Sequence, residues 1–205
     1  MTSSRFFINY LFEKRGMILI ILGIFLFIGI LFTIVRPFEY SSTSRVLIIH
    51  KINPNLDAYT AARAAEKLTQ NLATIIYSSS FLETLETSYN VNLPPDESRR
   101  RQAWKEKITV KVQPGTSILQ ITAYDKNPED AKKLDYLVAN TLITQGQEYH
   151  GGGPDVVIKL LDKPLTSGFP TRPNIFLNLA GALILGLIFA YLIILKEYYQ
   201  LFQHH

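Results

Sequence analysis

The sequence predicts a membrane protein in which two transmembrane helices flank one small α+β domain. The prediction rests on two long uncharged apolar stretches near the ends of the chain and on the strand and helix patterns between them. The chain has 205 residues, which is enough for one compact domain with accessory segments. The patterns follow the order β-α-(α)-β-β-α-β, which places helices on one face of a small antiparallel or mixed sheet.

Both apolar stretches are long enough to cross a bilayer. Residues 16–35 form a stretch of 20 uncharged residues, and residues 175–195 form one of 21. Each gives about 30 Å of helix, which matches the hydrocarbon core of a membrane. A signal peptide is the alternative for the first stretch, but the stretch is too long and no small-residue cleavage site follows it. We therefore expect two retained transmembrane helices.

The two ends of the chain should lie on the same side of the membrane. We assign residues 1–15 to a cytoplasmic N-terminal segment and residues 196–205 to a cytoplasmic tail. Basic residues flank the first span almost equally on both sides, but long segments are translocated largely regardless of their charge. We therefore expect residues 36–163 to form an extracytoplasmic domain. The chain has no cysteine, so disulfides are excluded, and its net charge of +4 does not single out nucleic acid as a partner.

The central domain begins with a strand and a long helix. The segment FEYSSTSRVLIIHK is rich in β-branched and aromatic residues and predicts a strand that ends near His50. INPNLD is a turn, and its Asp57 suits the cap of the following helix. Apolar residues at three- and four-residue steps predict one face of that helix: Ala58, Ala61, Ala65, Leu68, Leu72 and Ile75. This alanine-rich face suits either close packing between subunits or a thin core.

Two shorter helices and a hairpin follow. FLETLETSY and LPPDESRRRQAWKEK predict the helices, and Pro94 and Pro95 suit the start of the second because their φ is fixed. In ITVKVQPGTSILQITAYD, apolar and polar residues alternate on both sides of Pro114-Gly115, which predicts a β-hairpin. The apolar members of this alternation are Ile108, Val110, Val112, Leu119, Ile121 and Ala123.

The domain ends with another helix and a last strand. Asn127 suits the helix cap, Pro128 the first helical position, and acidic residues the first turn. The expected buried stripe of this helix is Ala131, Leu134, Val138 and Leu142. GGGP then breaks the chain, and DVVIKLLD predicts a strand that leads back to the membrane.

A proline-rich collar, residues 164–174, precedes the second span. Pro164, Pro170 and Pro173 lack backbone donors and have a fixed φ, so this segment suits neither a helix nor an interior strand. We expect an extended, semi-rigid strut of polyproline or irregular type. Such a strut would set the distance and angle between the last strand and the second span.

Small residues in the two spans predict a helix-packing surface. Ala182, Gly186 and Ala190 recur every four residues, and Gly181 lies beside them. This spacing opens a groove for close helix contact inside lipid. The partner is either the first span, which contains Gly23 and Gly29, or a neighbouring subunit. The alternative is that glycine is simply common in membrane helices.

The sequence lacks recognisable catalytic, cofactor and metal motifs. The glycine run at 151–153 has no following lysine-serine or lysine-threonine, so it is not a phosphate loop. His50, His150, His204 and His205 have no metal-ligand spacing, and no nucleophile elbow is present. Neither span contains Asp, Glu, Lys, Arg or His, which argues against a self-contained transporter or channel. We therefore expect a protein that is not an enzyme.

Two surface features remain open. Arg99, Arg100 and Arg101 suit either contact with an anionic polysaccharide or partner, or a solvated helix face beside Glu97 and Glu106. Four aromatic residues suit either a sugar-stacking platform or core and interface positions. These residues are Trp104, Tyr124, Tyr136 and Tyr149.

Three segments carry a resemblance to a known family. They are FEYSSTSRVLI after the first span, PGTSILQITAYDKNPEDAKKLDYLVANTL in the middle, and VIKLLDKPLTSGFPTRPNIFLNLAGALILGL at the second span. On these segments the chain resembles the Wzz-type polysaccharide co-polymerases, the chain-length determinant family, over essentially its whole length. The residues that fit the family's proline-rich motif are Pro164, Pro170, Pro173, Asn174, Asn178, Gly181 and Gly186.

The resemblance implies a homo-oligomeric protein of the bacterial inner membrane that acts without a cofactor. It would govern the length or export of a surface polysaccharide, such as O-antigen, capsule or exopolysaccharide, by scaffolding a polymerase or export partner. The domain is too short for the long helical arm of the larger members, so it looks like a minimal base domain.

The resemblance also leaves two other functions open. The first is an adaptor that activates a cytoplasmic tyrosine kinase of polysaccharide synthesis. Tyr198 and Tyr199 would then be phosphorylation or kinase-contact sites, although the tail is short and no Walker-type nucleotide site is present. The second is a structural accessory subunit of another membrane assembly.

Overall fold

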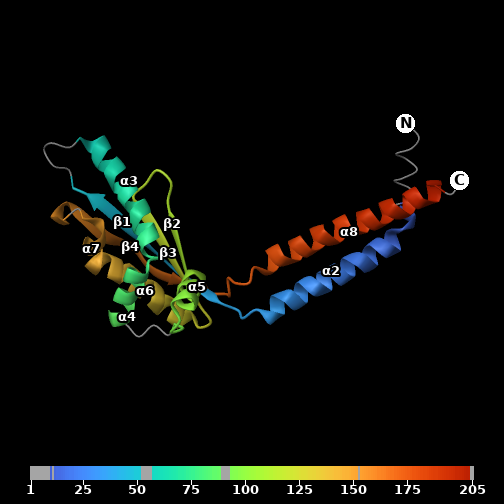
Figure 1. The fold of residues 1–205 in the computed structure, drawn as a ribbon, viewed down its shortest axis with the longest axis horizontal. Helices are drawn as coiled ribbons and strands as arrows, with labels where there is room; N and C mark the ends of the chain where they lie inside the picture. Colours follow the sequence, from blue (N-terminus) through green and yellow to red (C-terminus); the bar gives the residue numbers. More distant parts are fainter. Residues whose placement is uncertain (1–9, 11, 52–56, 89–92, 152, 204–205) are drawn as a thin grey trace. The chain divides into compact units, whose positions relative to one another are not determined.

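A computed structural model describes residues 10, 12–51, 57–88, 93–151 and 153–203. The chain divides into two compact units, whose elements are labelled in Figure 1. The central unit comprises Glu39–Thr171, and the helical unit comprises Met1–Phe38 together with Arg172–His205.

The helical unit contains the two apolar helices that the sequence predicts. α2 (Arg15–Val35) and α8 (Ile175–Gln203) are both long and apolar enough to cross a membrane. The helix α8 continues well beyond Leu195, where the sequence places the end of the span. The residues expected to form a tail are therefore helical as far as Gln203. These two helices indicate an association with the membrane.

The central unit contains a four-stranded antiparallel sheet. Its strands are β1 (Tyr40–His50), β2 (Ile108–Val112), β3 (Ile118–Asp125) and β4 (Val156–Thr166). The strand order is β2-β3-β1-β4, so β1 lies inside the sheet, and β2 and β4 are its edges. The predicted hairpin is confirmed as β2 and β3, and Gly115 in its turn has a φ of 69° that glycine adopts without strain.

The helices of the central unit are α3 (Ala58–Ile75), α4 (Ser79–Ser88), α5 (Glu97–Lys107), α6 (Pro128–Gln145) and the short α7 (Gln147–His150). A 3₁₀ turn at Gly153–Asp155 precedes β4. The predicted fold class is confirmed: two apolar terminal helices flank an α+β domain with an antiparallel sheet.

Alternation along β1 shows which face of the sheet is covered. Ser42, Ser44, Val46 and Ile48 are buried, whereas the residues between them are exposed or half-buried. Because successive strand residues point to opposite faces, the helices cover one face of the sheet. The core between that face and the helices includes Leu72 of α3, Leu85 of α4, Trp104 of α5 and Val138 of α6.

Capping residues explain where the helices begin. Asp57 accepts a hydrogen bond from the Thr60 amide at 3.0 Å, and Asn127 accepts one from the Glu129 amide at 3.0 Å, so both predicted caps are confirmed. The start of α5 differs from the prediction. Its cap is Asp96, which accepts from the Arg99 amide, and Pro94 and Pro95 precede the helix.

The predicted buried stripes are largely confirmed. Ala131, Leu134, Val138 and Leu142 of α6 are all buried. On α3 the prediction is wrong at Ala58, which is exposed because the helix only begins there. Thr69 lies on the buried face instead, and its hydroxyl donates to the Ala65 carbonyl at 2.7 Å, which satisfies the polar group inside the core.

The last strand is longer than predicted and includes Pro164. Its register against β1 shifts twice, between Thr43 and Arg45 and between Arg45 and Val46, and at each shift β4 contains one residue more than β1. Proline is tolerated at edge strands and bulges because no ladder hydrogen bond is lost there. The strand therefore takes in the first three residues of the segment that the sequence assigns to the collar.

Candidate functional site

The small residues of the helical unit lie where α2 and α8 meet. A Cβ atom added to Gly29 would lie 2.8 Å from Ala182 Cβ. A Cβ atom at Gly186 would lie 3.1 Å from side-chain atoms of Leu22 and Phe25. Ala182, Gly186 and Ala190 are buried in α8. The absence of a side chain at Gly29 and Gly186 thus permits the close approach of the two helices.

Two other predicted packing residues lie outside this contact. Gly23 and Gly181 have open space around the position where a Cβ atom would be placed. The structure therefore brings Gly29, Ala182, Gly186 and Ala190 to one helix pair and leaves Gly23 and Gly181 away from it. Whether any of these residues contacts a neighbouring subunit stays a prediction.

The two asparagines of the proline-rich motif have direct structural roles. The Asn174 side chain accepts a hydrogen bond from the Leu177 amide at 3.0 Å, which caps the start of α8. The Asn178 amide donates to the Thr33 hydroxyl of α2 at 3.1 Å. Thr33 in turn donates to the Gly29 carbonyl at 2.8 Å. This chain of hydrogen bonds joins the two helices one turn from the Gly29–Ala182 contact.

The other end of the helix pair carries polar and aromatic contacts. Lys14 forms an ion pair with Glu197, and the Tyr10 and Tyr198 rings lie 5.7 Å apart. Tyr199 is 61% exposed. Of the two tyrosines that the sequence offers as kinase contacts, Tyr198 is half-buried against Tyr10, whereas Tyr199 is exposed.

The collar is held against the start of β1. The Ser167 amide donates to the Ser41 carbonyl at 2.8 Å, and the Thr171 amide donates to the Glu39 carbonyl at 2.8 Å. The segment between Pro164 and Pro170 is therefore tied to the sheet and is not a free-standing strut. As a result, the first and last residues of the central unit, Glu39 and Thr171, are neighbours, and the chain enters and leaves the unit at one place.

The arginine run on α5 is largely neutralised by acidic neighbours. Arg100 forms ion pairs with Glu83 and Glu86, and Arg101 forms one with Glu97. These pairings match the interpretation of a solvated helix face better than that of a free anion-binding cluster. Contact of Arg99, Arg100 and Arg101 with a polymer stays a prediction.

The four candidate platform aromatics do not form one surface. Trp104 is buried, and its indole nitrogen donates to the Ile76 carbonyl at 2.8 Å. Tyr149 packs against Phe81, whereas Tyr136 is 50% exposed on α6. Tyr124 lies opposite Ser41, on the sheet face that the helices leave open. The structure therefore favours separate core and surface positions.

A buried carboxylate was missed in the sequence analysis. Asp135 of α6 is 0% exposed and accepts hydrogen bonds from Ser42 at 3.0 Å and from Ser44 at 2.6 Å. Burial raises the pKa of Asp135 to about 6, and the two serine hydroxyls act in the opposite direction. The sequence does contain a signal for the burial of Asp135, because this residue lies four residues after Ala131 and three before Val138, within the apolar stripe of α6.

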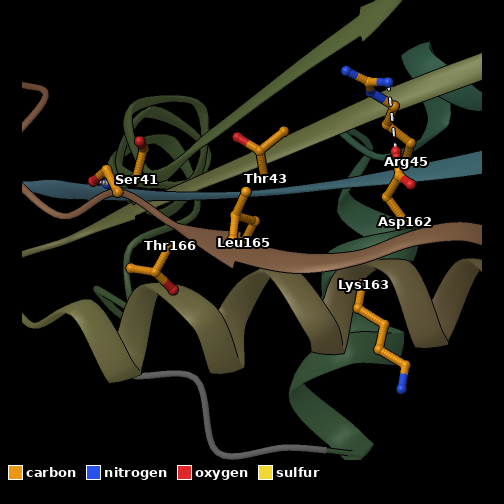
Figure 2. Close-up of a pocket in the computed structure, with 8 residues that line it drawn as sticks. Ser41, Thr43, Arg45, Asp162, Lys163, Leu165 and Thr166 are labelled. Atoms are coloured by element: carbon orange, nitrogen blue, oxygen red, sulfur yellow. Dashed lines mark hydrogen bonds and ion pairs between the residues drawn. The ribbon is translucent and has the colours of Figure 1, made fainter.

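The open face of the sheet carries a groove in which hydroxyl and charged side chains surround the exposed Leu165 (Figure 2). Its lining includes Ser41, Thr43 and Ser167 together with the charged residues Arg45 and Asp162. Arg45 and Asp162 lie 3.5 Å apart and are both about half exposed, so this ion pair is only partly desolvated. The Thr43 and Thr122 hydroxyls are hydrogen-bonded at 3.0 Å. Hydroxyls beside a cation suit a hydroxyl-rich, charged ligand better than an apolar one.

Among the described residues, no cluster of three potential metal ligands is present. His50 contacts the neighbouring Lys51 carbonyl, and the side chain of His150 lies outside the described atoms, as do His204 and His205.

Comparison with known proteins gives a similarity to one curated protein from two sources. The chain is 27% identical over 186 residues to the capsular polysaccharide biosynthesis protein CpsC of Streptococcus agalactiae, which covers 86% of this chain and 74% of CpsC. CpsC of S. agalactiae serotype Ia matches with the same identity and coverage. No protein-family model matches the chain. The similarity agrees with the expected resemblance at the level of polysaccharide biosynthesis.

Proposed function

We propose that this chain is a non-enzymatic membrane scaffold that acts in the biosynthesis of a surface polysaccharide such as a capsule. The observation that carries the proposal is the similarity to CpsC, which extends over 86% of the chain. The two apolar helices on either side of an α+β unit support it, because they are the arrangement that the Wzz-type resemblance implies.

In this proposal the protein governs the length or the export of the polymer. Several copies associate through the central unit outside the cytoplasmic membrane, and the assembly holds a polymerase or export partner. The neighbouring positions of Glu39 and Thr171 support this arrangement, because the connections to both membrane helices then leave the central unit from one place. Such a narrow attachment allows copies to pack side by side without interference between their helices.

The proline-rich segment provides the first test. Replacing Pro170 and Pro173 by glycine should change the length distribution of the polymer, because glycine loosens the connection between the central unit and α8. Membrane insertion should be unaffected, since the span itself is unaltered. Polymer length is measured by gel electrophoresis of the surface polysaccharide. The matched control replaces Pro94 and Pro95, which precede α5, and an unchanged length distribution in the Pro170–Pro173 variant would refute the role of the collar.

The expected topology has a separate test. Tyr59 of α3 is 74% exposed, and the chain has no native cysteine. A Tyr59→Cys variant should react in intact cells with a thiol reagent that does not cross the membrane. Reaction only after the membrane has been permeabilised would place the central unit in the cytoplasm and overturn the proposed arrangement.

An adaptor for a tyrosine kinase is the second candidate function. It is favoured by the continuation of α8 to Gln203 and by the exposure of Tyr199. Deletion of Lys196–Gln203 distinguishes the two functions, because only the adaptor predicts a loss of kinase activity while oligomers remain intact. A Tyr199→Phe variant should reproduce that loss, whereas Tyr198→Phe should have less effect because Tyr198 packs against Tyr10.

Identifying the partner proteins distinguishes the proposed scaffold from an accessory subunit of another membrane assembly. Native mass spectrometry of the full chain in detergent reports both the number of copies and the proteins that co-purify. The proposed scaffold should appear as an oligomer with proteins of polysaccharide synthesis or export. A strictly monomeric chain, or partners from an unrelated assembly, would contradict it.

A further inference from the structure

The outward face of the central sheet carries a row of positive charge. The strand register places Lys111 of β2 opposite Gln120 of β3, Gln120 opposite Arg45 of β1, and Arg45 opposite Asp162 of β4. Two residues after Arg45 on β1, Leu47 lies opposite Lys159 of β4. Alternation along the strands directs these side chains away from the core. We call Lys111, Arg45 and Lys159 the cationic row.

The members of the row are available to a ligand. Lys111 and Lys159 are exposed, and neither has an acidic partner among the described residues. Arg45 is about half exposed, and its contact with Asp162 is 3.5 Å long. Neighbouring strands lie roughly 5 Å apart, so Lys111 and Arg45 are separated by about 10 Å across the sheet. This spacing suits a chain with repeated negative charges better than a single small anion.

The surroundings of the row suit a saccharide. The Ser41, Thr43 and Ser167 side chains line the groove with Arg45, where their hydroxyls can exchange hydrogen bonds with sugar hydroxyls. Figure 2 shows Thr43 and Arg45 along the same strand, with Asp162 facing Arg45 and Lys163 pointing away from both. Leu47 and its partner Ile118 give a half-buried aliphatic patch on the other side of the row, which suits the C–H face of a sugar ring.

We propose that the cationic row binds an anionic polysaccharide, that is, a glycan whose repeating unit carries a carboxylate or phosphate. This inference rests on the proposed function in polysaccharide biosynthesis and names the surface that touches the polymer. Charge complementarity is the argument: the row consists of three cations with a single acid, Asp162, beside Arg45, whereas the arginines of α5 are mostly paired with glutamates. The polymer contact therefore moves from Arg99–Arg101 to the open face of the sheet.

The test uses the full chain in nanodiscs of uncharged phosphatidylcholine. The probe is an oligogalacturonate, which carries one carboxylate on each sugar, and the neutral control is a maltooligosaccharide of the same length. Binding is measured by isothermal titration calorimetry at low salt. The oligogalacturonate should bind with an affinity that falls as salt is added, because exposed ion pairs are screened. Equal binding of the neutral sugar would overturn the inference.

Variants that remove a charge locate the site: loss of a cation should weaken binding, and loss of the neighbouring acid should strengthen it. Lys111→Gln, Arg45→Gln and Lys159→Gln should each weaken binding by about two- to fivefold, the range that exposed ion pairs contribute. The triple variant should lose roughly ten- to a hundredfold if the three contributions add. Asp162→Asn should tighten binding by about twofold, because it removes the acid beside Arg45.

Matched controls come from α5. Arg99→Gln and Arg101→Gln remove the same charge outside the row and should change the affinity by less than about twofold. Emission from Trp104, which is buried in the core, reports whether each variant keeps its fold. A triple row variant that folds and still binds normally, or α5 variants that lose as much affinity as the row variants, would overturn the assignment.

Further outcomes distinguish polysaccharide binding from lipid binding, and failure of this inference from failure of the proposed function. If phosphatidylglycerol vesicles compete for the same three residues as strongly as the oligogalacturonate does, the surface binds lipid and the inference fails. If no oligogalacturonate binds while the Pro170–Pro173 variant still alters polymer length, the inference fails and the proposed function stands. If the row binds the probe but deletion of the protein leaves the cell's polysaccharide unchanged, the proposed function fails, and with it the biological polymer as ligand.

Discussion

The contact between Gly29 and Ala182 gives the sharpest quantitative prediction. A Gly29→Ala substitution places a Cβ atom 2.8 Å from Ala182 Cβ, whereas two carbon atoms normally approach to about 3.5–4.0 Å. The helices must therefore move apart locally by roughly 0.7 Å or more. The Asn178–Thr33 hydrogen bond, at 3.1 Å, should then lengthen and weaken.

The expected cost follows from overpacking. Extra methyl groups in a well-packed contact typically cost about 1–3 kcal/mol, which lowers the equilibrium constant for helix pairing by a factor of about 5 to 150. Gly23→Ala is the matched control, because Gly23 lies in the same helix with open space at its Cβ position. Both substitutions raise helix propensity by the same amount, up to about 1 kcal/mol in water. The difference between the two variants therefore isolates the clash.

Helix separation can be followed by energy transfer. The chain has no native cysteine, so dyes can be attached at Phe12→Cys and Tyr199→Cys, two exposed positions at the same end of the helix pair. Sodium dodecyl sulfate is titrated against the labelled full chain in a mild detergent, and loss of transfer marks separation. Gly29→Ala should separate at a lower fraction of dodecyl sulfate than the parent, and Gly23→Ala should not. Equal midpoints for the two variants would refute the reasoning.

Two further predictions concern polar groups. Asn178→Leu removes the hydrogen bond to Thr33 and should weaken helix pairing by about 0.6 kcal/mol in the same titration, whereas an unchanged midpoint would show that the bond adds nothing. The second concerns Asp135, whose raised pKa means that the folded state binds more protons than the unfolded state between pH 4 and 6. Stability of the central unit should therefore fall by up to about 3 kcal/mol as pH rises from 4 to 6 and then level off. Asp135→Asn should remove this slope in urea titrations of the full chain followed by Trp104 emission, and an unchanged slope would contradict the assignment.

The sequence alone predicted features that depend on local periodicity and capping. The two spans follow from the length of uninterrupted apolar runs. The hairpin and the stripe on α6 follow from repeats of two or of three to four residues, and Asp57 and Asn127 act on amides only a few positions away. The errors have local causes too. Ala58 was assigned to the buried face although the helix starts there, and Pro94 and Pro95 were taken as the helix start although Asp96 provides the cap.

The burial of Asp135 and its hydrogen-bond partners could not be predicted from the local sequence pattern alone. Its place in the apolar stripe was readable, but its partners Ser42 and Ser44 lie 93 and 91 residues away in the chain. Whether a carboxylate in such a stripe is buried, paired or turned outwards depends on which strand packs beneath the helix. A pattern within one element carries no information about that.

The sequence by itself determined the two apolar helices, the strands and helices between them, and the small residues suited to close helix contact. The tertiary structure alone decided that Gly29, and not Gly23, meets Ala182, and that β1 is an interior strand. It also decided that Lys111, Arg45 and Lys159 come together on the outward face of the sheet. The physical reason is that strand register and helix pairing are set by the summed packing of residues far apart in the chain. Periodicity reports only which face of each element is apolar.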